Sequence, residues 1–118
     1  MPEQRSGEPF TRLSVKEAHE LIKQGAEVID VRQPGEWAQG HLQQAKLIPV
    51  DGLYERIDEV AEDKDVLFYC AMGVRSALAA EIGAAMGRTR IFNMEGGIEA
   101  WKAAGLPLFK DAPPAAHR

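Results

Sequence analysis

One cysteine and one arginine, five positions apart, are the residues of this 118-residue chain best placed to do chemistry. Cys70 follows an apolar run at 66–69 that predicts a buried strand, and a helical pattern runs from Ser76 to Met86. The cysteine therefore lies on a tight loop between a strand and a helix, where loop amides and the helix N-terminus favour negative charge. Arg75 adds a cation, so we expect the thiol of Cys70 to ionise readily and to act as a nucleophile.

The residues that follow the cysteine are predicted to bind an anionic substrate. They are Ala71, Met72, Gly73, Val74, Arg75 and Ser76. Gly73 is expected to adopt a positive φ and to let the backbone approach the anion closely. The guanidinium of Arg75 suits sulfate-like oxygens. Ser76 is expected either to cap the helix or to hydrogen-bond the group that the sulfur carries.

A second set of polar residues follows the strand predicted at 28–31. Asp30 and Arg32 lie at its carboxyl end, and an ion pair of Arg32 with Glu36 is predicted to lock neighbouring loops. His41 is expected to form structural hydrogen bonds, because a thiolate already ionised by its loop needs no general base. Three scattered histidines and one cysteine do not predict a metal site, and no cofactor is expected.

The elements that must position these residues alternate along the chain. Further strands are predicted at 10–13, 45–49 and 91–94, and further helices at 14–24, 52–61 and 98–105. Ser14 and Glu17 form a predicted capping box, and Gly25 is expected to stop the helix that they start. Alternating strands and helices predict an α/β fold with a parallel sheet covered by helices on both faces.

Length and composition fit one domain, with 45% apolar and 27% charged residues. A net charge of −4 predicts no nucleic-acid partner, and a single cysteine predicts a reducing compartment. No signal peptide and no apolar run of roughly 20 residues are found, so a cytoplasmic protein without membrane contact is expected. A monomer is also expected. We predict a flexible segment at 1–9, a domain at 10–109 and a disordered tail at 110–118.

At the cysteine loop the sequence resembles the rhodanese family of sulfurtransferases. The segment 28–32, with Glu36-Trp37 and Gly40-His41-Leu42, looks like the first signature of that family, and 93–101 looks like its closing signature. With the loop, these matches span about residues 10–108 of the chain. The resemblance implies a single-domain rhodanese-like α/β sandwich around a parallel five-stranded sheet.

The same resemblance implies a reaction. Cys70 would take the outer sulfur of thiosulfate or of a persulfide, hold it as a cysteine persulfide, and pass it to an acceptor such as cyanide or a thiol. A protein persulfide is a further donor that the resemblance allows. Relatives that use thiosulfate well often carry a basic residue directly after the cysteine, whereas Ala71 and Val74 leave Arg75 as the only cation of this loop. The loop is therefore expected to suit a bulkier or less anionic donor.

Two other functions compete with this one. Cysteine-dependent phosphatases and arsenate reductases use Cys-x5-Arg, whereas Cys70 and Arg75 form Cys-x4-Arg, whose cradle should be too small for a tetrahedral oxyanion. A non-catalytic binding or sulfur-carrier module of the same fold is the other alternative, and the presence of Cys70, Gly73 and Arg75 argues against pure binding.

Overall fold

The computed structural model describes residues 2–111, and the tail predicted at 110–118 lies outside the described residues from position 112 onward. The strands are β1 (Thr11–Leu13), β2 (Glu27–Asp30), β3 (Ala45–Leu47), β4 (Val66–Tyr69) and β5 (Ile91–Met94). The α-helices are α1 (Val15–Lys23), α2 (Pro34–Trp37), α3 (Val74–Ala85) and α4 (Gly97–Ala103), and two 3-10 helices are η1 (Val50–Gly52) and η2 (Ile57–Glu59).

The five strands form one parallel sheet in the order β1-β5-β4-β2-β3, which confirms the predicted fold class. Strands β2 and β4 are neighbours, but the chain leaves them in opposite directions, toward β3 and toward β5. In parallel α/β sheets such a reversal opens a crevice at the carboxyl ends of the strands, where ligands bind. Arg32 follows β2 and Cys70 follows β4, so the topology brings both to this edge.

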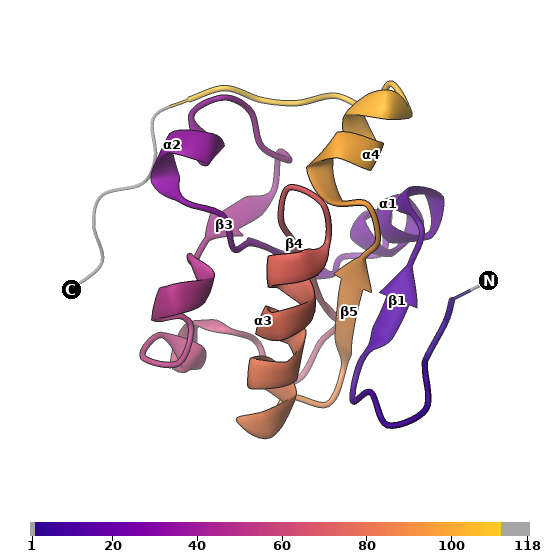
Figure 1. The fold of residues 1–118 in the computed structure, drawn as a ribbon, viewed down its shortest axis with the longest axis vertical. Helices are drawn as coiled ribbons and strands as arrows, with labels where there is room; N and C mark the ends of the chain where they lie inside the picture. The colour runs from indigo at the N-terminus through magenta and orange to yellow at the C-terminus, as the bar shows by residue number, and fades with distance from the viewer. Residues whose placement is uncertain (1, 112–118) are drawn as a thin grey trace.

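The central strand β4 is buried along its whole length and contributes to two cores. Successive residues of a strand point to opposite faces. Phe68 therefore packs with Ala79 of α3 on one face, and Leu67 packs with Ala18 of α1 and Trp101 of α4 on the other. Figure 1 shows α3 across one face of the sheet and α1 on the other. These two layers hold the ends of β2 and β4 in place.

Helix α1 begins and ends as the sequence predicts. The hydroxyl of Ser14 accepts a hydrogen bond from the amide of Glu17 at 3.1 Å, and the amide of Ser14 donates to the Glu17 carboxylate at 2.8 Å. Gly25 follows the helix with φ +99°, a conformation that glycine adopts without steric cost. Both predictions are confirmed.

The prediction of an α-helix at 52–61 is wrong, because this segment forms η1, turns and η2. The carbonyl oxygens of Ile57 and Val60 accept hydrogen bonds from the guanidinium of Arg88, at 2.8 and 3.1 Å. The amide of Val60 also donates to the Ile57 carbonyl at 2.9 Å, which is the shorter spacing of a 3-10 turn. The apolar spacing that predicted a helix reflects burial alone, since Leu53 and Val60 are buried.

The segment before β1 lies alongside that strand. The backbone of Glu3 pairs antiparallel with that of Arg12, and the Arg12 guanidinium pairs with Glu8 and, at 2.8 Å, with Glu95. The flexibility predicted for residues 1–9 stays a prediction. Within residues 2–111, no helix is both long and apolar enough to cross a membrane.

Candidate active site

Cys70 lies directly after β4, at the start of the loop that leads into α3. The residue is buried, with 1% of its surface exposed, and the loop lies beside the first turn of α4 (Figure 1). Helix α3 begins at Val74 rather than at the predicted Ser76, because Gly73 forms its N-cap with φ +99°. The positive φ predicted for Gly73 is therefore confirmed, and it lets the loop turn tightly onto the helix.

Hydrogen-bond donors of the loop surround the sulfur of Cys70. The amide of Gly73 lies 3.1 Å from Sγ, and the amide and the hydroxyl of Ser76 each lie 3.4 Å from it. Burial raises the pKa of the Cys70 thiol, but the hydrogen bonds from Ser76 and from the amides of Gly73 and Met72 outweigh it and hold the pKa below 9.0. The loop therefore favours the thiolate, as predicted, chiefly through hydrogen bonds rather than through Arg75.

The hydroxyl of Ser76 faces the site and does not cap the helix. It donates to Asn93 Oδ1 at 2.5 Å, while lying 3.4 Å from the Cys70 sulfur. Asn93 in turn donates from Nδ2 to the carbonyl of Gly73 at 3.3 Å, so it ties the loop to β5. Both side chains are fully buried. Sequence reasoning missed the role of Asn93, although an amide within a predicted buried strand is a signal, since buried polar groups need partners.

The base of the loop is held by the N-terminus of α4. The amide of Ile98 donates to the carbonyl of Cys70 at 2.9 Å, and the amide of Glu99 donates to the carbonyl of Ala71 at 3.1 Å. A Cβ at Gly97 would lie 2.5 Å from both carbonyl oxygens, so only glycine fits there. A Cβ at Gly73 would lie 3.3 Å from the backbone of this same turn. Gly73 thus approaches the turn before α4 closely, and its approach to a bound anion stays a prediction.

Arg75 is paired with Glu36 of α2. Its two terminal nitrogens Nη1 and Nη2 donate to the two carboxylate oxygens of Glu36, each at 2.8 Å. The predicted pairing of Glu36 with Arg32 is wrong, because Arg32 is turned into the protein while Arg75 reaches across from α3. The hydrogen bonds and charge of Arg75 hold the pKa of Glu36 at about 2, so both groups are charged at neutral pH.

Arg32 pairs with Asp30 inside the protein instead. Its guanidinium donates to the Asp30 carboxylate at 2.7 Å and to the carbonyl of Gly40 at 2.7 Å. The hydroxyl of Tyr69 donates to the same carboxylate at 2.6 Å, and burial together with the Asp30 charge raises the pKa of Tyr69. Asp30 and Arg32 are both buried. This cluster joins the ends of β2 and β4 to the loop before His41, which is the locking role predicted for the two charges.

His41 forms the structural hydrogen bonds that the sequence predicts. Its Nδ1 lies 2.7 Å from the carbonyl of Leu42, its Nε2 pairs with Asp111, and its ring stacks on Trp37 at a centroid distance of 3.7 Å. No hydrogen bond joins His41 to Cys70 in the described part of the chain. In residues 2–111, no group of three or more histidine, cysteine, aspartate or glutamate side chains could hold a metal ion.

The outer side of the loop presents apolar side chains to solvent. Met72 is 69% exposed and Val74 is 77% exposed, whereas Ala71 is half-buried against α4. Leu78, one turn beyond Val74 on α3, is also exposed, at 52%. The outer side of the loop and of the first turns of α3 therefore exposes three apolar side chains beside the Arg75–Glu36 pair.

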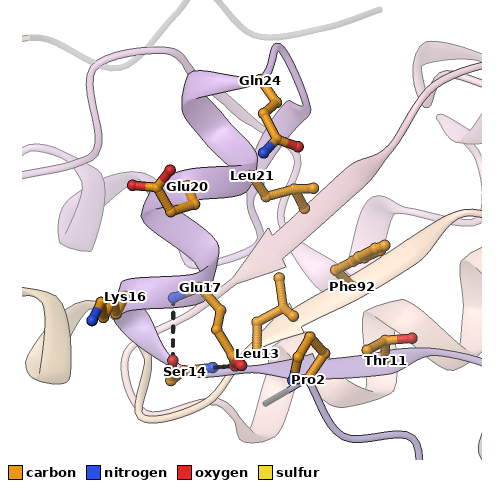
Figure 2. A pocket seen from close by; sticks show the side chains of 10 residues that line it. All are labelled: Pro2, Thr11, Leu13, Ser14, Lys16, Glu17, Glu20, Leu21, Gln24 and Phe92. Atoms are coloured by element: carbon orange, nitrogen blue, oxygen red, sulfur yellow. Dashed lines mark hydrogen bonds between the residues drawn. The ribbon is translucent and has the colours of Figure 1, made fainter.

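A separate groove of about 520 Å³ lies between α1 and the strands β1 and β5. Figure 2 shows Leu13 and Leu21 beside Phe92 in this groove, with the Ser14 hydroxyl engaged in the cap of α1. It lies on the face of the sheet opposite α3, away from the Cys70 loop. Its described lining contains no cysteine or histidine.

The sheet order and the buried cysteine on a glycine-capped loop define an α/β fold of the rhodanese type. A family model for the rhodanese-like domain matches residues 14–104, so this chain belongs to the rhodanese family. The rhodanese-related protein of Thermoplasma volcanium has the same fold, with a TM-score of 0.79, 33% identity, and 85% of this chain and 98% of that chain covered.

Two curated relatives show the range of the family. The thiosulfate sulfurtransferase GlpE of Actinobacillus pleuropneumoniae is 32% identical over 102 residues, 86% of this chain and 94% of its own. The uncharacterized protein YqhL of Bacillus subtilis (strain 168) is 42% identical over 76 residues, 64% of this chain. The match spans 60% of the length of that second relative.

Proposed function

We propose that this protein is a sulfurtransferase that carries sulfane sulfur as a persulfide on Cys70. The observation that carries the proposal is the set of polar groups around the sulfur: the amide of Gly73 lies 3.1 Å from Sγ, and the amide and the hydroxyl of Ser76 each lie 3.4 Å from it. Groups that stabilise a thiolate also stabilise the terminal sulfur of a persulfide anion, which arises in the same loop. Membership of a family that includes a thiosulfate sulfurtransferase supports the same proposal.

The reaction has two steps and needs no added oxidant. The Cys70 thiolate attacks the outer sulfur of the donor, an Sγ–S bond forms, and the donor's S–S bond breaks with its electron pair on the leaving group. With thiosulfate the leaving group is sulfite. An acceptor such as cyanide or a thiolate then attacks the terminal sulfur, and Cys70 leaves as the thiolate, which is a ping-pong scheme. The loop's hydrogen bonds lower the pKa of the Cys70 thiol, so the scheme assigns no general base.

A phosphatase reaction is less compatible with this site. The Cys-x4-Arg spacing makes a small loop, and the guanidinium of Arg75 is occupied by Glu36 rather than free to surround a tetrahedral oxyanion. The physiological donor and acceptor, a cytoplasmic location and a monomeric state remain proposals that rest on the sequence.

The test is turnover of the purified protein with a sulfur donor and cyanide, followed as thiocyanate. We expect wild type to form thiocyanate and Cys70→Ser and Cys70→Ala to form none, with circular dichroism unchanged for all three. Turnover by either variant would show that the sulfur is carried elsewhere. A folded wild type that forms no thiocyanate with any sulfane-sulfur donor would favour a non-catalytic binding module.

A further inference from the structure

The only cation of the Cys70 loop is neutralised in the folded protein. Arg75 is the one charged residue between positions 70 and 76, and both of its terminal nitrogens are held by the carboxylate of Glu36. A bidentate pair of this kind is among the stronger and more directional charge-assisted contacts. An incoming anion therefore meets a pair of zero net charge instead of a free guanidinium.

The carboxylate is itself fixed on α2 and does not follow Arg75 passively. The amide of Gln33 donates to Glu36 Oε1 at 3.0 Å, so the carboxylate completes a capping box at the start of that helix. Its position is determined by α2, and Arg75 of α3 reaches across to it. Displacing Glu36 from Arg75 would leave a fixed negative charge beside the site.

The pair is accessible to dissolved ions. The side chains of Arg75 and Glu36 are 36% and 35% exposed. Arg75 directly precedes Ser76, whose amide lies 3.4 Å from the Cys70 sulfur, so the first turn of α3 brings the ion pair beside the site. A donor that approaches the sulfur must therefore come within the field of both members of the pair.

From this geometry we infer that Glu36 sets the donor selectivity of the enzyme by charge: it makes the site favour sulfane-sulfur donors with one negative charge or none over dianionic thiosulfate. This inference rests on the proposed sulfur-transfer function. Without the Glu36 charge, Arg75 would be free to attract an anion, and attraction by a focused charge raises association rates by about tenfold or more. The gain should be larger for two charges than for one, since the Coulomb energy scales with charge.

Two donors isolate this effect, because they differ by one charge and little in shape. Thiosulfate loses its outer sulfur to the Cys70 thiolate and leaves as sulfite. Methanethiosulfonate has a methyl group in place of one charged oxygen, loses its outer sulfur in the same way, and leaves as methanesulfinate. In both cases the Sγ–S bond forms as the donor S–S bond breaks, and the leaving group keeps the electron pair.

The experiment measures kcat/KM for both donors, with cyanide as acceptor, at low and high salt. For Glu36→Gln we expect kcat/KM for thiosulfate to rise about tenfold at low salt and kcat/KM for methanethiosulfonate to rise clearly less. The gain for thiosulfate should appear mainly in KM and should shrink as salt rises. Glu36→Asp, which keeps the charge, should retain the wild-type preference between the two donors.

Glu81→Gln serves as the matched control, because it removes one carboxylate from an exposed position of α3 without touching the pair. Glu81→Gln should leave kcat/KM unchanged for both donors. Thermal unfolding should show that every variant is folded. If Glu36→Gln changes kcat/KM for both donors by the same factor, or lowers kcat/KM for both, Glu36 only positions the loop and the inference is overturned. If folded wild type transfers sulfur from neither donor, the proposed function is contradicted, and the inference that rests on it is contradicted as well.

Discussion

The hydroxyl of Ser76 is shared between Asn93 and the sulfur of Cys70. It lies 2.5 Å from Asn93 Oδ1, to which it donates, and 3.4 Å from Cys70 Sγ. A hydroxyl has one proton, so Asn93 determines how much of this donor the thiolate receives. We therefore expect Asn93 of β5 to tune the reactivity of Cys70 through the Ser76 hydroxyl.

We predict that Ser76→Ala raises the pKa of Cys70 and slows its reaction with iodoacetamide. A hydrogen bond to a charged group is worth about 1.5–3 kcal/mol, and this one is long, so the alkylation rate at neutral pH should fall by about three- to tenfold. The rates should converge at high pH, where both proteins are fully thiolate. The measurement is the alkylation rate of the single cysteine across pH.

Ser14→Ala provides the control for this prediction. It removes a hydroxyl from the cap of α1 and should lower stability by about 1 kcal/mol while leaving the alkylation of Cys70 unchanged. Equal alkylation profiles for wild type and Ser76→Ala would mean that the amides of Gly73 and Ser76 alone stabilise the thiolate.

Gly97→Ala is expected to destabilise the loop that carries Cys70. The added Cβ would lie 2.5 Å from the carbonyl oxygens of Cys70 and Ala71, at a residue whose φ is +58°. Overpacking of this kind costs about 1–3 kcal/mol, and a positive φ adds strain. Urea unfolding should show this loss, and sulfur transfer should fall with it.

Gly35→Ala is the matched glycine control. No atom lies within 4 Å of a Cβ built there, and its φ lies outside the left-handed region. The free energy of unfolding of Gly35→Ala should equal that of wild type or exceed it by about 0.4–1 kcal/mol. If Gly97→Ala is as stable and active as wild type, α4 does not hold the loop in the way that the structure indicates.

The ion pair between Glu36 and Arg75 predicts a pH dependence of stability. Arg75 holds the folded pKa of Glu36 at about 2, below the ordinary 4.5. A carboxyl with a lowered folded pKa contributes stability above its ordinary pKa and loses it as the pH falls through the folded value. The free energy of unfolding of wild type should therefore exceed that of Glu36→Gln above about pH 4.5, with the difference shrinking toward pH 2.

The size of that difference should be at most about 1 kcal/mol at neutral pH, because a partly exposed pair is screened by water. Urea unfolding at several pH values measures it, with Glu81→Gln as a control for the loss of one exposed charge. A difference that persists undiminished at pH 2 would assign the effect of Glu36→Gln to packing rather than to charge.

Ala71→Arg is predicted to improve thiosulfate as a donor. It adds a cation next to Cys70 that no carboxylate of the loop can neutralise, so kcat/KM for thiosulfate should rise by about three- to tenfold at low salt. Salt should reduce the gain. Ala104→Arg, at the other end of α4, adds the same charge away from the loop and should have little effect. Unchanged thiosulfate kinetics in Ala71→Arg would show that charge does not limit this donor.

The sequence predicts local features of the site well. The lowered pKa of Cys70 and the positive φ of Gly73 follow from residue types placed between an apolar strand and a helix, because each depends on neighbours a few positions away. The parallel sheet follows from alternating strands and helices for the same reason.

Partners far apart in sequence are not predicted. Glu36 lies near Arg32 along the chain, and that proximity favours the wrong pair; the true partner, Arg75, is 39 positions away. The contact of Ser76 with Asn93 spans 17 positions and depends on the register of β5 beside β4. Such pairs are set by how strands align in the sheet, which residue spacing alone does not specify.

The measurement that tests the sulfur-transfer account most directly is the mass of the intact protein after incubation with a sulfane-sulfur donor and removal of the excess. We predict a gain of about 32 Da, one sulfur atom, located on the peptide that contains Cys70. Cyanide should remove the added mass and release one thiocyanate per protein, and Cys70→Ser should gain nothing. A wild-type protein that gains no mass with thiosulfate, methanethiosulfonate or an organic persulfide, or a Cys70→Ser variant that gains it equally, would contradict the account.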